Sequence, residues 1–154
     1  MARTSTVGWL LRGASAGAAG TTALNVVTYL DMAVRGRPAS STPGNTVEKL
    51  AETAHLTVPG DGATRASRVE GLGALTGLVA GIGVGGLFGL ARASGFRAGT
   101  LLTTLTVLLS TNGPMTVLGV TDPRTWSAVD WISDLVPHLA YGAVVTTTLD
   151  AFER

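Results

Sequence analysis

Four long stretches of the chain carry few or no charged side chains, and polar segments separate them. A helix of about 20 apolar residues is long enough to cross the hydrocarbon layer of a bilayer. The pattern therefore predicts an all-α fold, an integral membrane four-helix bundle that forms a single domain over residues 1–154. The predicted spans are residues 12–34, 70–91, 98–120 and 129–149.

The second predicted span contains glycines at every fourth position within the uncharged run 71–91. In water each glycine destabilises a helix by roughly 1 kcal/mol relative to alanine. In hydrocarbon the backbone must close its hydrogen bonds internally, so the helix persists and the glycines form a groove that a neighbouring helix can approach closely. The predicted packing glycines are Gly73, Gly77, Gly81, Gly85 and Gly89.

The first predicted span has small residues at the same interval, at Gly13, Gly17 and Thr21, and Asn25 follows on the same face. We therefore expect glycine-stripe packing between the first and second spans. The alternative is a secretory signal peptide, because Ala14-Ser15-Ala16 resembles a cleavage site, but the apolar run continues well past this point.

The polar first loop, predicted at 35–68, is rich in Pro, Ser and Gly. Within it, Thr42 followed by Pro43 resembles a helix start, and apolar residues at helical spacing as far as Ala54 predict a short amphipathic helix. Two roles fit this helix equally well: it lies on the membrane surface, or it is a solvated connector.

The third and fourth spans carry polar interruptions. Pro114 removes one backbone donor and predicts a kink near Ser110, where Thr111 or Asn112 could supply partners for the freed carbonyls. The fourth span is free of charge only over 135–149, so its first turns must lie in the headgroup region. Trp126 and Trp131 suit that depth.

A column of ionisable side chains on the fourth span is the sharpest candidate for chemistry. Asp130, Asp134 and His138 recur at intervals of four and share one helix face. A carboxylate beside an imidazole at membrane depth can relay protons. The structural alternative is that the carboxylates favour the positive end of the helix dipole and that His138 bonds the third span. With Asn25 and Asn112, these residues form the candidate intramembrane polar site.

Composition narrows the classes of function. Only 14% of the 154 residues are charged, against about 25% in soluble domains. The chain has no cysteine, and its two histidines, His55 and His138, lie far apart, so we expect no metal and no cofactor. The net charge of +1 offers no basic surface for a nucleic acid partner. No nucleophile–base set or phosphate loop is present, so we expect no enzyme activity.

The segment from Pro114 to Pro123, with Trp126 and the spacing of Ser133 to His138-Leu139, resembles the YagU-like small inner-membrane proteins of bacteria. That group shares a polar segment after the first span, a tryptophan before the last span and a Ser-x-x-x-x-His-Leu pattern within it. The resemblance covers the last quarter of the chain well and the remainder only in layout. The first loop departs from it and has the style of actinobacterial membrane proteins. The resemblance implies this topology, no established molecular activity and at most a link to acid tolerance.

Together these observations predict a non-enzymatic scaffold or accessory protein, multi-pass in the bacterial plasma (inner) membrane. Its expected partners are the lipid bilayer and either another membrane protein or a second copy of the chain. We expect cytoplasmic termini, because the short turn from Arg92 to Arg97 carries only positive charge. The alternative function is a proton-linked transport or conductance element that uses Asp134 and His138.

Overall fold

The computed structural model describes residues 5–154, and these residues form five α-helices and one short 3-10 helix, without a strand. The all-α class is therefore confirmed. The elements are α1 (Thr6–Arg35), α2 (Thr42–Thr53), α3 (Gly62–Ala93), α4 (Thr100–Val117), η1 (Pro123–Thr125) and α5 (Ala128–Ala151).

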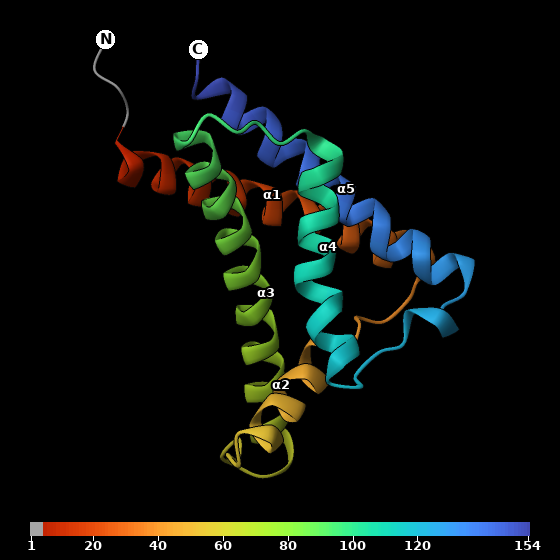
Figure 1. Cartoon of the computed structure of the whole chain (residues 1–154). Helices are drawn as coiled ribbons and strands as arrows, with labels where there is room; N and C mark the ends of the chain where they lie inside the picture. Colours follow the sequence, from red (N-terminus) through yellow and green to blue (C-terminus); the bar gives the residue numbers. More distant parts are fainter. Residues whose placement is uncertain (1–4) are drawn as a thin grey trace.

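The four long helices pack as successive neighbours in the order α3, α1, α5 and α4. Helix α1 packs against both α3 and α5, whereas α4 packs mainly against α5. The start of α1 and the C-terminus lie at one end of the molecule, and α2 lies at the opposite end, against the first turns of α3 (Figure 1). Helix α5 therefore connects α1 to α4 and takes part in both interfaces.

The helices extend beyond the uncharged runs from which they were predicted. Helix α3 begins at Gly62, so the last part of the predicted polar loop 35–68 is helical. Helix α1 begins at Thr6, where the Ser5 hydroxyl accepts a hydrogen bond from the Gly8 amide and caps the first turn. An uncharged run shows which part of a helix has apolar side chains. The helix itself can extend beyond that run, because charged side chains are tolerated on its exposed turns.

The predicted short helix in the polar loop is confirmed as α2, with a proline in its first turn. It docks on α3 through small residues. A methyl carbon at Gly73 would lie 2.9 Å from the Pro43 carbonyl carbon. Arg65 of α3 also pairs with Glu48 of α2 at 2.5 Å. The loop is thus fastened to α3.

Helix α4 continues through Pro114 and ends at Val117. The proline therefore does not end the helix, although it stands one turn before its C-terminus. Gly119 follows with φ +70° and turns the chain toward η1. Helix α5 contains the second internal proline, Pro137, which is buried.

The buried core is small for a chain of this size. The described residues expose 9246 Å², whereas a compact soluble protein of 15.6 kDa exposes about 7,300 Å² by the usual scaling with mass. Tyr141 and Val145 of α5 and Ala16 of α1 are fully buried at the centre. Most of the larger aliphatic side chains face outward.

Among the helices of the described residues, α3 alone is both long and apolar enough to cross a bilayer by length and composition. Only 33% of its most apolar stretch is buried, whereas the core helix of a soluble protein would be mostly buried. The other long helices miss this standard because Gly, Thr, Ser and Asn in α1 and α4, and the polar groups of α5, lower their hydropathy. The four-span arrangement therefore stays a prediction.

Candidate functional site

Helices α1 and α3 cross at their glycines. A methyl carbon at Gly17 would lie 2.6 Å from the Gly81 carbonyl oxygen, and one at Gly13 would lie 2.7 Å from the Gly89 Cα. A methyl carbon at Gly85 would lie 2.5 Å from the Gly13 carbonyl oxygen. These neighbours are backbone atoms, which cannot rotate away as a side chain can, so the two helices meet here only because side chains are missing.

The remaining residues of the two predicted stripes have separate surroundings. Thr21 lies against Gly81, and its hydroxyl donates to the Gly17 carbonyl at 2.8 Å. Gly73 instead faces α2, and a methyl group at Gly77 would meet no neighbour within 4 Å in the described part of the chain. Crossing helices move apart on either side of their crossing point. The glycine face of α3 therefore contacts α1 near the crossing and α2 near its start, and it is open at Gly77 between them.

Two further glycines that the sequence analysis missed hold α5 in place. A methyl carbon at Gly20 of α1 would lie 2.6 Å from a Val145 methyl group. One at Gly142 of α5 would lie 2.9 Å from the Thr100 carbonyl oxygen of α4. Gly20 continues the small-residue face of Gly13 and Gly17 at helical spacing, and this signal was available in the sequence.

A polar group joins α4 to α5. The Asn112 side-chain amide donates to Asp134 Oδ2 at 2.8 Å. His138 Nδ1 lies 2.6 Å from the Asp134 carbonyl oxygen and 3.5 Å from the Asp134 carboxylate, and His138 Nε2 lies 3.3 Å from the Thr111 hydroxyl. His138 is buried, with 8% of its surface exposed. The structure thus brings together Asn112, Asp134 and His138 and adds Thr111, which the sequence analysis did not select for this site.

The other two candidates of the predicted polar site, Asp130 and Asn25, take no part in these hydrogen bonds. Asp130 forms a capping box with Ser127, in which the Ser127 hydroxyl accepts from the Asp130 amide and the Asp130 carboxylate accepts from the Ser127 amide. Asp130 is exposed at the start of α5. None of the hydrogen bonds that join Asn112, Asp134 and His138 involves Asn25 of α1.

The end of α1 is tied to the start of α5. Arg35 pairs with Asp31 one helical turn away at 3.2 Å, as its spacing predicts. Arg35 also donates to the Ser133 hydroxyl at 2.7 Å, and Arg37 pairs with Asp31 at 2.5 Å. The contact with Ser133 joins residues 98 positions apart and had no signal in the sequence.

An arginine buried at the opposite end was expected only to mark the end of α3. The Arg92 side chain is 2% exposed, donates to Asp150 Oδ1 at 2.6 Å and lies 3.0 Å from Glu153 Oε1. Desolvation by burial lowers the pKa of Arg92, but its hydrogen bonds to Asp150 and Glu153 outweigh this effect and hold the pKa above its ordinary value. Glu153 also pairs with Arg97 at 3.0 Å.

Arg12 of α1 is held at the same end. Its guanidinium lies 5.1 Å from the centre of the Trp9 ring and 5.7 Å from the centre of the Phe152 ring. It also donates to the Phe152 carbonyl at 3.2 Å. The last turn of α5 is therefore held by arginines from both α1 and α3.

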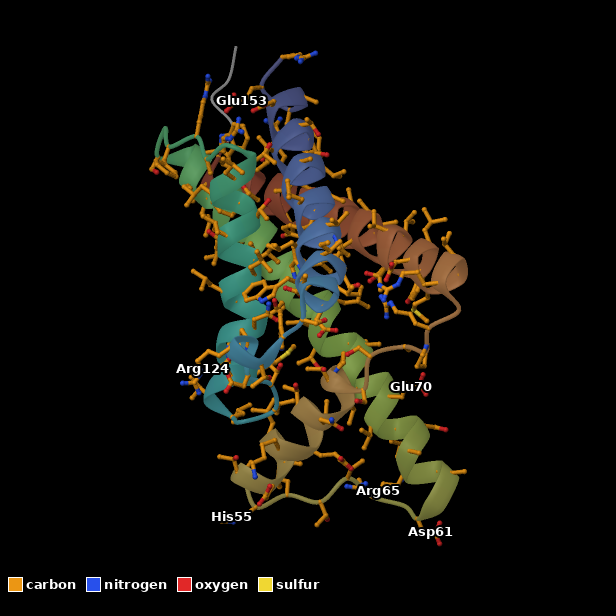
Figure 2. All side chains as sticks on the ribbon, turned by 90° about the vertical axis from the view of Figure 1, so that its right-hand side faces the viewer. His55, Asp61, Arg65, Glu70, Arg124 and Glu153 are labelled. Atoms are coloured by element: carbon orange, nitrogen blue, oxygen red, sulfur yellow. The ribbon has the colours of Figure 1, made fainter. Side chains whose placement is uncertain are left out.

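Charged residues are spread unevenly over the molecule. Of the residues labelled in Figure 2, Glu153 lies at one end, His55, Asp61 and Arg65 lie at the other, and Glu70 and Arg124 lie between them. Between these ends the helices have long uncharged stretches, which are 13–30 on α1, 71–91 on α3, 98–121 around α4 and 135–149 on α5.

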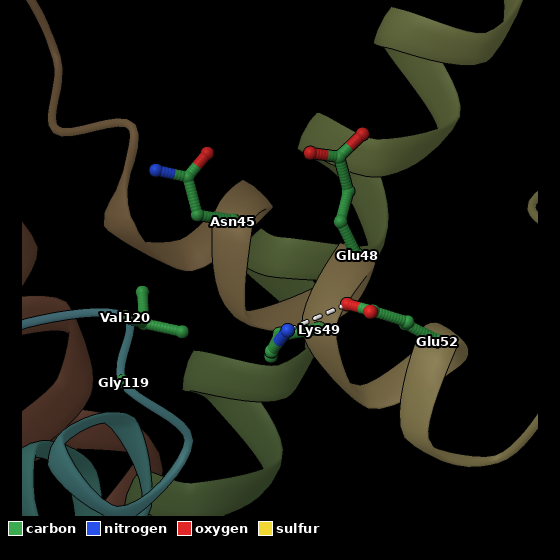
Figure 3. A pocket seen from close by; sticks show the side chains of 6 residues that line it. All are labelled: Asn45, Glu48, Lys49, Glu52, Gly119 and Val120. Atoms are coloured by element: carbon green, nitrogen blue, oxygen red, sulfur yellow. Dashed lines mark hydrogen bonds and ion pairs between the residues drawn. The ribbon is translucent and has the colours of Figure 1, made fainter.

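An open hollow lies between α2 and the turn after α4. It is lined by Asn45, Glu48, Lys49 and Glu52 of α2 and by Gly119 and Val120 (Figure 3). Lys49 and Glu52 pair with each other at 2.7 Å across one helical turn. Their charges are already matched, and within residues 5–154 no cluster of three or more His, Cys, Asp or Glu side chains is arranged to hold a metal ion.

Comparisons with protein families, curated proteins and solved structures find no match for this chain. The resemblance to the YagU-like proteins therefore stays a prediction that depends on the quoted motifs alone. The site must be interpreted from its own geometry.

Proposed function

We propose that the chain is a multi-pass protein of the bacterial inner membrane, in which α1, α3, α4 and α5 cross the bilayer and form a compact non-enzymatic scaffold or accessory subunit. One observation carries the proposal: all four long helices contain uncharged stretches, and large apolar side chains on these helices face outward. Such a surface fits the hydrocarbon layer of a bilayer.

The outward-facing side chains come from all four helices. Val26 of α1 is 51% exposed, Val79 of α3 is 70%, Leu105 of α4 is 55% and Ile132 of α5 is 61%. Soluble monomers rarely expose contiguous apolar patches larger than a few hundred Å². Acyl chains would cover this surface without any change in the fold.

The start of α5 has features of a membrane interface. Trp126 and Trp131 pack edge to face, with ring centres 5.0 Å apart, and the Trp126 indole donates to the Thr121 hydroxyl at 2.9 Å. Indole rings favour the headgroup region, where the ring is in apolar contact and the N–H meets polar groups. The short uncharged stretch of α5 thus begins at an aromatic anchor.

The absence of cysteine gives this proposal a clean test, because single cysteines can be placed without background. Thr53→Cys and Ser94→Cys lie on opposite exposed turns, and Val79→Cys lies on the outward face of α3. In sealed vesicles a water-soluble maleimide should label the first two from opposite sides and should leave Val79→Cys unlabelled. Equal labelling of all three, or recovery of a folded monomer in the aqueous fraction without detergent, would refute membrane insertion.

The scaffold role is tested by cross-linking in native membranes. A side chain at Gly81 must displace Thr21 of α1, so Gly81→Leu should reduce assembly or abundance. Asp134→Asn should change assembly little. If Asp134→Asn abolished the cross-linked species while Gly81→Leu preserved them, the polar group and not the helix crossing would organise the assembly.

A second candidate function is proton-linked transport or conductance through the α4–α5 interface. The contacts among Asn112, Asp134 and His138 favour it, because they place an imidazole and a carboxylate together below the surface. Beyond His138 the two helices are in direct contact, since a methyl carbon at Gly142 would lie 2.9 Å from the Thr100 carbonyl oxygen and the Thr146 hydroxyl lies 3.4 Å from the Thr103 hydroxyl. Conduction therefore requires the helices to separate. Reconstituted vesicles should show a pH-dependent flux that His138→Ala abolishes, and an unchanged flux would rule this function out.

A further inference from the structure

We propose that His138 is a proton-binding site between α4 and α5, which gains and releases one proton at Nε2 while the surrounding heavy atoms keep their places. The proposal goes beyond the scaffold role and does not require conduction across the membrane. It depends on which atoms around the imidazole can donate a hydrogen bond and which can only accept one.

Nδ1 of His138 carries hydrogen in both protonation states. It lies 2.6 Å from the Asp134 carbonyl oxygen, and a carbonyl can only accept a hydrogen bond. The contact therefore fixes the neutral ring as the tautomer with hydrogen on Nδ1. Nε2 is left as the atom at which a proton is gained or lost.

Nε2 faces a partner that can serve both states. The Thr111 hydroxyl lies 3.3 Å from Nε2 and 3.0 Å from the Val107 carbonyl oxygen of its own helix. With a neutral ring, the hydroxyl donates to Nε2. With a charged ring, Nε2–H donates to the hydroxyl oxygen, and the hydroxyl hydrogen rotates to the Val107 carbonyl. Both states are satisfied by one rotation of a hydroxyl group.

The Asp134 carboxylate is close enough to balance the charge of a protonated His138 ring. The Asp134 carboxylate lies 3.5 Å from Nδ1, and Asn112 of α4 holds it by a hydrogen bond of 2.8 Å. Helix α4 presents only the neutral Thr111 and Asn112 to the imidazole, and α3 has no charged residue over 71–91. The charged groups that α1 brings to this part of α5 are Arg35, which bonds Ser133, and its partner Asp31.

Proton binding strengthens the pairing of α4 with α5. The hydrogen bond between Nε2 and Thr111 crosses from one helix to the other, and a charged donor makes such a bond roughly twice as strong as a neutral one. The protonated ring therefore joins the two helices through this bond more strongly than the neutral ring does.

Nitrogen-15 NMR of the imidazole groups in the full-length protein in detergent micelles tests the site directly. The chain has two histidines, and His55→Gln assigns the signals. The neutral ring of His138 should carry hydrogen on Nδ1, and Nε2 should gain a proton on acidification while the protein stays folded. A neutral ring with hydrogen on Nε2, or a ring that gains no proton before the protein unfolds, would overturn the proposal.

Thermal unfolding of the same samples tests the coupling to helix packing. The pH dependence of the wild-type midpoint should change in His138→Gln, which keeps an amide in place of the ring. His55→Gln changes an exposed histidine and should behave as the wild type. If His138→Gln retained the wild-type pH dependence, the proposal would be wrong. If that variant failed to fold, the wild-type NMR titration would still decide, and neither result depends on membrane insertion.

Discussion

Gly85 lies where α1 and α3 cross, and its replacement by alanine is a direct test of why these helices meet. The new methyl carbon would lie 2.5 Å from the Gly13 carbonyl oxygen and 2.6 Å from the Gly17 amide nitrogen. Ordinary contact begins at 3.4 Å. The helices must therefore separate locally by about 0.9 Å (3.4 − 2.5). A gap of about 0.5–1 Å between packed atoms already loses roughly a quarter to a half of their dispersion attraction.

Gly77→Ala provides the matched control, because a methyl group there meets no neighbour within 4 Å in the described residues. Both variants gain the same helix propensity, up to about 1 kcal/mol in water. The propensity gain cancels in their difference, which leaves the cost of overpacking. Overpacking costs about 1–3 kcal/mol, so Gly85→Ala should be less stable than Gly77→Ala by about that amount.

The assay is unfolding of the purified variants in mixed detergent micelles, followed by helical circular dichroism. Gly77→Ala should unfold at or above the wild-type midpoint, and Gly85→Ala should unfold below it. If both variants shifted equally and in the same direction, the crossing would not depend on the missing side chain, and the reasoning from close backbone approach would fail.

Three further changes test the ends and the centre of the molecule by the same unfolding assay. Arg92→Ala removes a buried cation that pairs with two partly exposed carboxylates and should cost about 1.5–3 kcal/mol. Arg97→Ala, at a side chain 71% exposed, should cost less than about 1 kcal/mol, and equal effects would refute the importance of burial. Tyr141→Phe removes the buried hydrogen bond to the Gly81 carbonyl and should cost about 1 kcal/mol, so an unchanged midpoint would contradict it. Ser127→Ala removes the cap of α5 and should also cost about 1 kcal/mol; no loss would show that the cap is dispensable.

Helix positions could be predicted from local patterns because each helix satisfies its own backbone. The uncharged runs located the four long helices, and Thr42 followed by Pro43 located α2. The first turns of α3 were missed because Arg65 and Arg68 make that segment polar, yet a helix tolerates charged side chains on an exposed surface.

The candidate polar site was predicted in part. The interval of four placed Asp134 and His138 on one face of α5, and the structure puts them in contact. The same interval included Asp130 in this column, but its side chain turns back to cap the helix at Ser127. Thr111 was not selected, because threonine is common along α4 and nothing in the sequence distinguishes the one opposite the imidazole.

The sequence by itself determined that this chain is helical, where its helices lie and which residues share a helix face, since these properties depend on neighbours within a few positions. The tertiary structure decided which faces meet. In the tertiary structure Gly81, Gly85 and Gly89 contact α1, Gly73 contacts α2, and Gly77 has no neighbour within 4 Å among the described residues. The tertiary structure also joined Arg12 to Phe152 across 140 positions. A spacing of four defines a face, but the crossing of whole helices, fixed by all their contacts together, determines what that face touches.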